Sequence, residues 1–198
     1  MGAADTRGRR ITERMRTSTS LEFFKVLNEV MEDPSFNQIH AGVAYDTLVG
    51  FKQARTLKST DEPALEKLQV KTKDYVLQGE VGKKKFYRLF WALAQLMDAI
   101  PSVPKLLPDM VKAYPKVTSI GPQALSECLW TLARLKDAAP EVMNFAPDLA
   151  KHVATRAPKM TDPQLRDSLW AAGILKDVED VAKIMPILEA EATKRGLS

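Results

Sequence analysis

Apolar residues recur along this chain at the three- and four-residue spacing of amphipathic helices. Between residues 125 and 135, leucine occupies one broad helical face and charged residues occupy the other sides. No stretch alternates apolar and polar residues over more than a few positions, as a half-buried strand does. The pattern therefore predicts an all-α chain.

The helical pattern returns at a fixed interval that tryptophan marks. Trp91, Trp130 and Trp170 lie 39 and 40 residues apart, in the stretches FWALAQLMD, LWTLARLKD and LWAAGILKD. A period of about 40 residues fits a pair of helices, and such a pair must stack on its neighbours to bury its apolar face. The chain is therefore predicted to be an α-solenoid of stacked helix pairs, with three clear repeats and one degenerate repeat.

Capping residues and prolines predict where the helices of a repeat begin. In the last copy we expect Asp162 to cap the first helix, with Pro163 in its first turn. Proline interrupts a helix, so the second helix is expected to begin at Pro108 in one copy and at Pro147 in the next. The third copy ends sooner, as a capping repeat does.

These boundaries divide the chain into an arm and a repeat domain. Residues 1–20 form a basic N-terminal arm, expected to be disordered in isolation, and residues 21–198 form the helical-repeat domain. Phe51, forty residues before Trp91, marks the degenerate repeat. The predicted parts of the domain are a capping helix at 21–35, the degenerate repeat at 36–80, repeats at 81–119 and 120–160, and the terminal capping repeat at 161–198.

The stretches ALSECLWTLARLKD and QLRDSLWAAGILKD resemble the first-helix signature of octotricopeptide repeats. They are also similar to the helical repeats of FAST-kinase-domain proteins, RAP-domain proteins and the heptatricopeptide proteins of protists. The resemblance covers residues 82–198 well and 36–81 poorly, over a short array without a RAP domain. It implies RNA binding in mitochondria or plastids, in transcript processing, stability or translation, and in several lineages as a ribosomal subunit.

Basic charge is gathered in two segments of the chain, whose net charge is +4. Residues 1–20 hold five arginines against two acids, and residues 51–88 hold ten basic residues against five acidic ones. Clustered basic side chains can follow a phosphate backbone. The residues predicted to contact RNA phosphates are Arg7, Arg9, Arg10, Arg14, Arg16, Lys71, Lys73, Lys83, Lys84, Lys85 and Arg88.

The tryptophans have two interpretations. Residues flanked by leucine and alanine at helical spacing are most simply packed between the two helices of a repeat, and we favour that interpretation. The alternative is a stacking platform for bases. The predicted repeat core is Trp91, Leu129, Trp130, Leu135, Leu169, Trp170 and Leu175. Three positions before each tryptophan stand Arg88, Glu127 and Asp167, which are either base-reading side chains or a solvated face.

No pattern in the chain indicates catalysis, a cofactor or a metal. A glycine-rich phosphate loop and a nucleophile elbow are both missing. Cys128 is expected to be a small, partly buried helix residue, and neither His40 nor His152 has a second ligand at a recurrent spacing. The chain has 45% apolar residues but no apolar run of 18 residues, so no membrane insertion is expected.

The sequence therefore predicts a non-catalytic helical-repeat protein that binds RNA and neighbouring proteins in a large organellar assembly. The first choice is a lineage-specific ribosomal subunit of mitochondria or, alternatively, of plastids. Two alternatives remain. One is a scaffold or accessory subunit of another organellar complex without RNA contact. The other is a free RNA-processing or stability factor.

Overall fold

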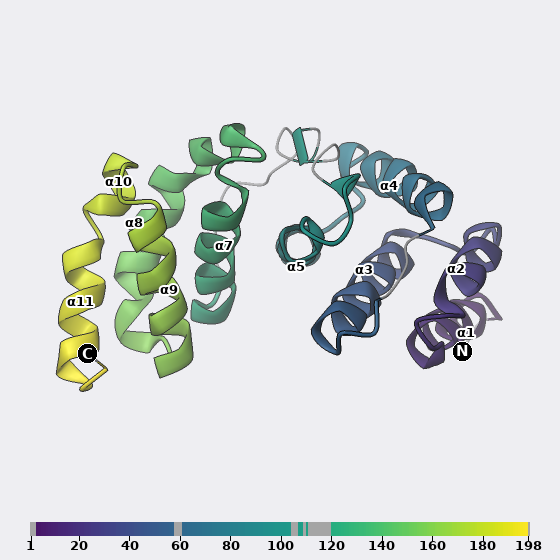
Figure 1. Ribbon diagram of the computed structural model, residues 1–198, viewed down its shortest axis with the longest axis horizontal. Helices are drawn as coiled ribbons and strands as arrows, with labels where there is room; N and C mark the ends of the chain where they lie inside the picture. Colours follow the sequence, from purple (N-terminus) through teal and green to yellow (C-terminus); the bar gives the residue numbers. More distant parts are fainter. Residues whose placement is uncertain (1–2, 58–60, 104–106, 109, 111–119, 198) are drawn as a thin grey trace. The chain divides into compact units, whose positions relative to one another are not determined.

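Every element of the computed structural model is a helix within the described residues, which are 3–57, 61–103, 107–108, 110 and 120–197. The side chains of residues 3–5, 83 and 84 lie outside this description. The chain forms two compact units, Met1–Ala113 and Tyr114–Ser198, which we call unit 1 and unit 2 (Figure 1). The prediction of an all-α chain is confirmed.

Unit 1 contains five helices with described bounds. These are α1 (Ala3–Thr17), α2 (Phe23–Met31), α3 (Gln38–Gln53), α4 (Glu62–Leu77) and α5 (Lys83–Leu96). Helix α3 packs against both α1 and α5, and α2 packs against α4 (Figure 1). The odd-numbered helices therefore form one row, and α2 and α4 pack beside them.

Residues 1–20 were expected to be a basic arm that is disordered in isolation, but within the chain most of this segment is a packed helix. Residues 3–17 form α1, which packs on α2 and α3. Ile11 and Met15 lie one helical turn apart and are both buried, with Met15 fully so. These two apolar residues, on a helix rich in arginine, anchor α1 because α3 and α2 provide a surface that buries them.

Residues 36–80, predicted to be a degenerate repeat, contain the helix pair α3 and α4, and the N-cap of α3 gives a register other than the predicted one. Each of Trp91, Trp130 and Trp170 follows the N-cap residue of its helix by nine positions. The N-cap of α3 is Asn37, so Asp46 occupies the tryptophan position rather than Phe51. Phe51 packs instead against Phe23 of α2, with ring centroids 5.5 Å apart.

The core of unit 1 is built from the facing sides of these helices. Phe23, Leu27, Tyr45, Leu48 and Leu65 are completely buried. Burial raises the pKa of the Tyr45 hydroxyl far above its ordinary value, so the group remains protonated. In the predicted repeat 81–119, the first helix is α5. The segment where the second helix was expected to begin, at Pro108, lies largely outside the described residues.

Unit 2 holds the other two predicted repeats. Its elements are α7 (Pro122–Leu135), a 3₁₀ turn (Pro140–Phe145), α8 (Ala146–Arg156), a second 3₁₀ turn (Ala157–Lys159), α9 (Asp162–Ile174), α10 (Glu179–Ala182) and α11 (Met185–Lys194). Helix α9 packs between α7 and α11, and α8 packs against α7. The second helix of repeat 120–160 begins at Ala146, next to the expected Pro147.

The N-cap of α9 is Thr161, so the prediction that Asp162 caps this helix is wrong. The backbone N–H of Thr161 donates to the side chain of Gln164 at 3.0 Å, which is half of a capping box. Asp162 and Pro163 occupy the first turn. Gly121 and Pro122 begin α7 as expected, with glycine as the N-cap.

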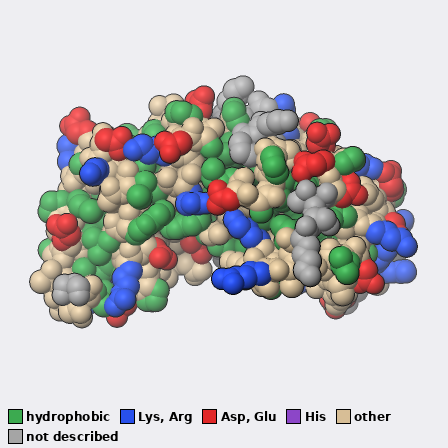
Figure 2. All heavy atoms as spheres, viewed as in Figure 1, with side chains coloured by type: hydrophobic (Ala, Val, Ile, Leu, Met, Phe, Trp, Pro, Cys, Tyr) green, Lys and Arg blue, Asp and Glu red, His purple; other side chains and the backbone are tan. Residues whose placement is uncertain are grey.

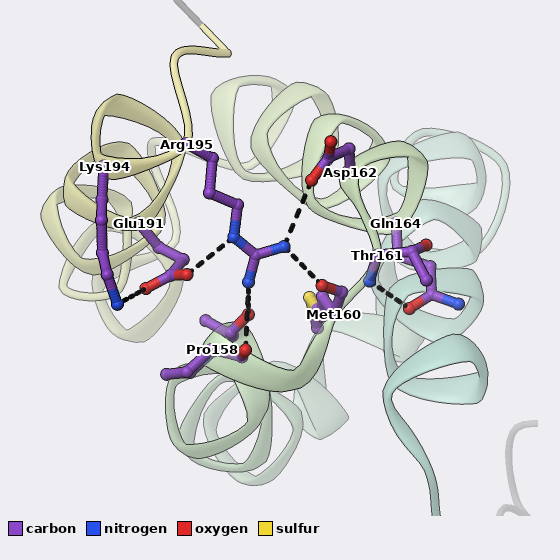
Figure 3. A network of polar contacts seen from close by, with 9 residues as sticks. Pro158, Met160, Thr161, Asp162, Gln164, Glu191, Lys194 and Arg195 are labelled. Atoms are coloured by element: carbon purple, nitrogen blue, oxygen red, sulfur yellow. Dashed lines mark hydrogen bonds and ion pairs between the residues drawn. The ribbon is translucent and has the colours of Figure 1, made fainter.

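Arg195 ties the last helix to the start of α9 (Figure 3). Its guanidinium donates to Glu191 at 2.7 Å and to the carbonyl oxygens of Met160 and Pro158 at 2.6 and 3.0 Å. It also forms an ion pair with Asp162 at 3.3 Å. Carbonyls at a helix boundary have no intrahelical partner, so the planar guanidinium satisfies several at once.

Candidate nucleic-acid interface

Four of the predicted basic residues line two hollows on the row of α1, α3 and α5, which we call the α1–α3–α5 face. The larger hollow, of about 490 Å³, lies between α1 and α3 and includes Arg9 and Arg16. The smaller, of about 180 Å³, lies between α3 and α5 and includes Lys85 and Arg88. Ile39 of α3 lines both hollows, so they adjoin.

Arg88 links a carboxylate and an aromatic ring on this face. Its Nε lies 2.9 Å from a carboxylate oxygen of Asp46 on α3. Its guanidinium carbon lies 4.1 Å from the centroid of the Trp91 ring, the geometry of a cation–π contact. Arg88 is therefore held in place, and part of its charge is already balanced by Asp46.

The acids on the α1–α3–α5 face are fewer than the bases. Among the residues that line the two hollows, Glu13 and Asp46 oppose Arg9, Arg16, Lys85 and Arg88. Asp46 occupies the position that tryptophan holds in later repeats, and it engages Arg88. A surplus of cations over two adjoining hollows suits a polyanion, because phosphates gain most where basic charge is concentrated.

Two of the other predicted contact residues form ion pairs within the fold. Arg7 pairs with Asp33 at 2.9 Å, and Arg14 pairs with Glu29 of α2. These pairs hold α1 against the segment from α2 to the start of α3. Lys71 and Lys73 lie on α4, outside the row of α1, α3 and α5, and Arg10 is exposed on α1. The side chains of Lys83 and Lys84 lie outside the described residues.

His40 has a structural role that the sequence did not reveal. Its Nδ1 accepts the backbone N–H of Asn37 at 3.0 Å, so the ring closes the cap of α3. Its Nε2 lies 3.0 Å from the carbonyl oxygen of Gly8 and can donate to it. A Cβ at Gly8 would stand 3.4 Å from His40 Nε2, which is close van der Waals contact, so α1 lies directly against the His40 ring.

The residues of the predicted repeat core differ in burial. Leu129, Leu135 and Leu175 are fully buried. Leu169, Trp91 and Trp130 are only partly buried, and Trp170 is 47% exposed. The leucine just before Trp130 points into the core, so the bulky ring one position later, about 100° around the helix, reaches the surface.

Metal chemistry finds no support in the part of the chain that the structure describes. No group of three or more His, Cys, Asp or Glu side chains converges there. Cys128 is buried, in agreement with the expectation of a packed helix residue. Among the same described residues, no helix is both long and apolar enough to span a bilayer.

In comparisons with known proteins, no family model, curated protein or solved structure matches the chain.

Proposed function

We propose that this chain is a non-catalytic helical-repeat protein that binds single-stranded RNA on the α1–α3–α5 face. The observation that carries the proposal is the gathering of Arg9, Arg16, Lys85 and Arg88 around two adjoining hollows. Phosphates would contact these cations, and the Trp91–Arg88 pair offers a flat surface on which a base can stack.

The distribution of charge also supports RNA binding on unit 1, which contains the α1–α3–α5 face. Residues 114–198 carry eleven basic and eleven acidic side chains, so the whole net charge of +4 belongs to residues 1–113. A polyanion is therefore attracted to unit 1 rather than to unit 2.

We propose that the helix pairs within each unit are copies of one repeat in an α-solenoid, a view supported by the common nine-residue offset from N-cap to tryptophan.

The cellular role rests on the resemblance to octotricopeptide and related repeats. We propose a component of an organellar ribonucleoprotein, most directly a ribosomal subunit of mitochondria, with plastids as the alternative. A free RNA-processing factor is the second candidate with RNA contact. Ultraviolet crosslinking of the protein to RNA in its native cells separates the two. Reads at ribosomal RNA sites support the subunit, and reads on one messenger support the processing factor.

Binding of a labelled 15-nucleotide single-stranded RNA, followed by fluorescence anisotropy over a range of salt, tests the RNA proposal. The variant combines Arg9→Ala, Arg16→Ala and Lys85→Ala. Loss of three phosphate contacts should make the log–log salt slope shallower by about 2, at about 0.7 per contact on a single strand. The affinity at low salt should fall in parallel.

The matched control removes three exposed lysines from unit 2, by Lys151→Ala, Lys159→Ala and Lys176→Ala. It lowers the net charge of the chain by as much as the first triple variant does. Its salt slope should remain that of the parent chain. Equal loss in both triple variants would mean that RNA responds only to total charge, and the α1–α3–α5 face would then not be the site.

A further inference from the structure

An exposed apolar strip crosses two adjacent helices of unit 2. It consists of Trp130 on α7 and Trp170 and Ile174 on α9, which we call the tryptophan strip. The two indole rings are stacked, with centroids 6.2 Å apart and planes 29° apart. Trp170 is 47% exposed and Ile174 is 44% exposed. Figure 2 shows hydrophobic side chains gathered over α9 and its neighbours on the face toward the viewer.

The strip is continuous because α7 and α9 are firmly packed side by side. The Ser126 hydroxyl of α7 donates to the carbonyl oxygen of Gln164 on α9 at 2.8 Å. At the other end, the Lys136 ammonium lies 2.7 Å from the Asp177 carboxylate, just after α9. The strip between these two contacts is therefore a fixed surface. Large exposed apolar groups on a fixed surface are typical of an interaction site.

Charged residues of opposite sign border the strip on its two sides. Three positions before the tryptophans stand Glu127 and Asp167, one helical turn toward the start of α7 and α9. Four positions after Trp130 stands Arg134, whose guanidinium carbon lies 5.8 Å from the Trp130 ring centroid. The strip thus has the carboxylates of Glu127 and Asp167 toward the helix starts, with the exposed Arg166 next to Asp167, and Arg134 toward the helix ends.

This arrangement favours a protein over a nucleic acid as the occupant. An RNA strand stacked on the two indole rings would bring its phosphates near the carboxylates of Glu127 and Asp167, and unit 2 has no net charge to offset that repulsion. Exposed tryptophan, here with an arginine beside it, is in contrast among the residues that contribute most to protein interfaces.

We propose that the tryptophan strip docks an amphipathic helix of a neighbouring protein. Apolar residues at positions i and i+4 of that helix are separated by a rise of about 6 Å, close to the spacing of the two indole rings. Lysine or arginine along one side of the partner helix would face Glu127 and Asp167. The surface is on unit 2 and does not depend on RNA binding by unit 1.

Selection from a displayed library of random 16-residue peptides against the full chain tests the proposal. We expect enrichment of peptides with apolar residues at i, i+3 or i+4, and i+7, and with basic residues on one side. Synthetic copies should bind the parent chain at least tenfold more tightly than the double variant Trp170→Ser, Ile174→Ser. The matched control, Leu21→Ser with Val70→Ser, removes two exposed apolar residues of unit 1 and should bind as the parent does.

Charge reversal tests the stated chemistry of the partner. Glu127→Lys combined with Asp167→Lys should weaken the basic peptides at least tenfold and should enrich acidic ones in a repeated selection. Circular dichroism melts confirm that each variant is folded. Failure to enrich any peptide that distinguishes the parent from Trp170→Ser, Ile174→Ser would overturn the proposal, as would enrichment of acidic peptides by the parent. Loss of RNA affinity in that double variant, with no effect on peptides, would assign the strip to nucleic acid instead.

Discussion

At the scale of single residues, positions only a few steps apart on one helix have opposite environments. Leu165 of α9 is fully buried, whereas Trp170 of the same helix is 47% exposed and touches Trp130. The size of a side chain is therefore a poor guide to its energetic weight in this protein. A leucine with all its neighbours around it loses more on truncation than a tryptophan with one face in water.

Leu165→Ala is expected to lower the free energy of unfolding by about 2–5 kcal/mol, because it leaves a cavity in the core. Trp170→Ala should cost only about 1 kcal/mol, mainly from the lost contact with Trp130. Urea unfolding of the two variants, followed by far-ultraviolet circular dichroism, gives both numbers. If Trp170→Ala lowered the free energy of unfolding more than Leu165→Ala does, Trp170 would have to be counted as a core residue.

At the scale of elements, α1 depends on few contacts. Its apolar anchors are Ile11 and Met15, its ion pairs use Arg7 and Arg14, and Gly8 contacts the His40 ring. Most other positions of α1 are polar and exposed, so the helix has little stability without α2 and α3. Most of the residues lining the larger hollow on the α1–α3–α5 face belong to α1, so the loss of this helix would remove Arg9 and Arg16 from the site.

Met15→Ala should detach α1 while the rest of the protein remains folded. Truncating a fully buried methionine costs about 2–5 kcal/mol, which is large for one short helix. Hydrogen exchange measured by mass spectrometry should show faster exchange for residues 3–17 and unchanged exchange for α7 and α9. Arg10→Ala, at an exposed position of the same helix, is the control and should leave the protection of α1 intact.

The docking of α1 should also weaken in acid. The Asp33 carboxylate accepts the backbone N–H of Ser35 at 2.8 Å and pairs with Arg7 at 2.9 Å, and these contacts lower the pKa of Asp33. A lowered pKa in the folded state adds stability at neutral pH, and that stability is lost as the pH falls below about 3.9, the ordinary value for aspartate.

Thermal melts from pH 7 to pH 2.5 measure this effect. The difference in Tm between the parent and Asp33→Asn should be greatest at neutral pH and should shrink in acid, because the parent then also carries an uncharged group. A difference in Tm that stays constant over this range would mean that the Asp33 charge does not stabilise α1.

At the scale of the whole molecule, the chain divides into two units with different surface chemistry. Unit 1 carries the entire net charge and the α1–α3–α5 face, whereas unit 2 is neutral overall and carries the tryptophan strip. Each unit has its own set of fully buried leucines and other apolar residues. In the proposed function, RNA would bind to unit 1 and a partner helix to unit 2.

We expect residues 114–198 to fold without unit 1. The core around α7, α8, α9 and α11 is internal to this segment, and Arg195 joins its last helix to the corner before α9. The isolated segment should give a helical circular dichroism spectrum and a cooperative melt. It should bind the selected peptides and should not bind single-stranded RNA. A spectrum without helical minima would show that its core needs unit 1.

Much of the fold could be predicted because repetition in the sequence reports the helix periods directly. The fixed interval between tryptophans located α5, α7 and α9, and apolar spacing located α2, α3 and α4. The role of α1 could not be predicted from composition, since Ile11 and Met15 among arginines resemble a solvated segment. The register of α3 was missed for a related reason. Phe51 matched the interval, whereas the cap at Asn37 was the better reference.

The sequence by itself determined the helical class, the limits of most helices and the excess of basic charge near the N-terminus, because these follow from local spacing and composition. Only the tertiary structure decided that Arg7 and Arg14 pair with acids of other elements, that Arg9, Arg16 and Arg88 line the hollows, and that Trp170 is half exposed. Exposure and ion pairing depend on residues from other helices. For Arg7 and Asp33, or Trp130 and Trp170, those partners lie 26 and 40 positions apart in the chain.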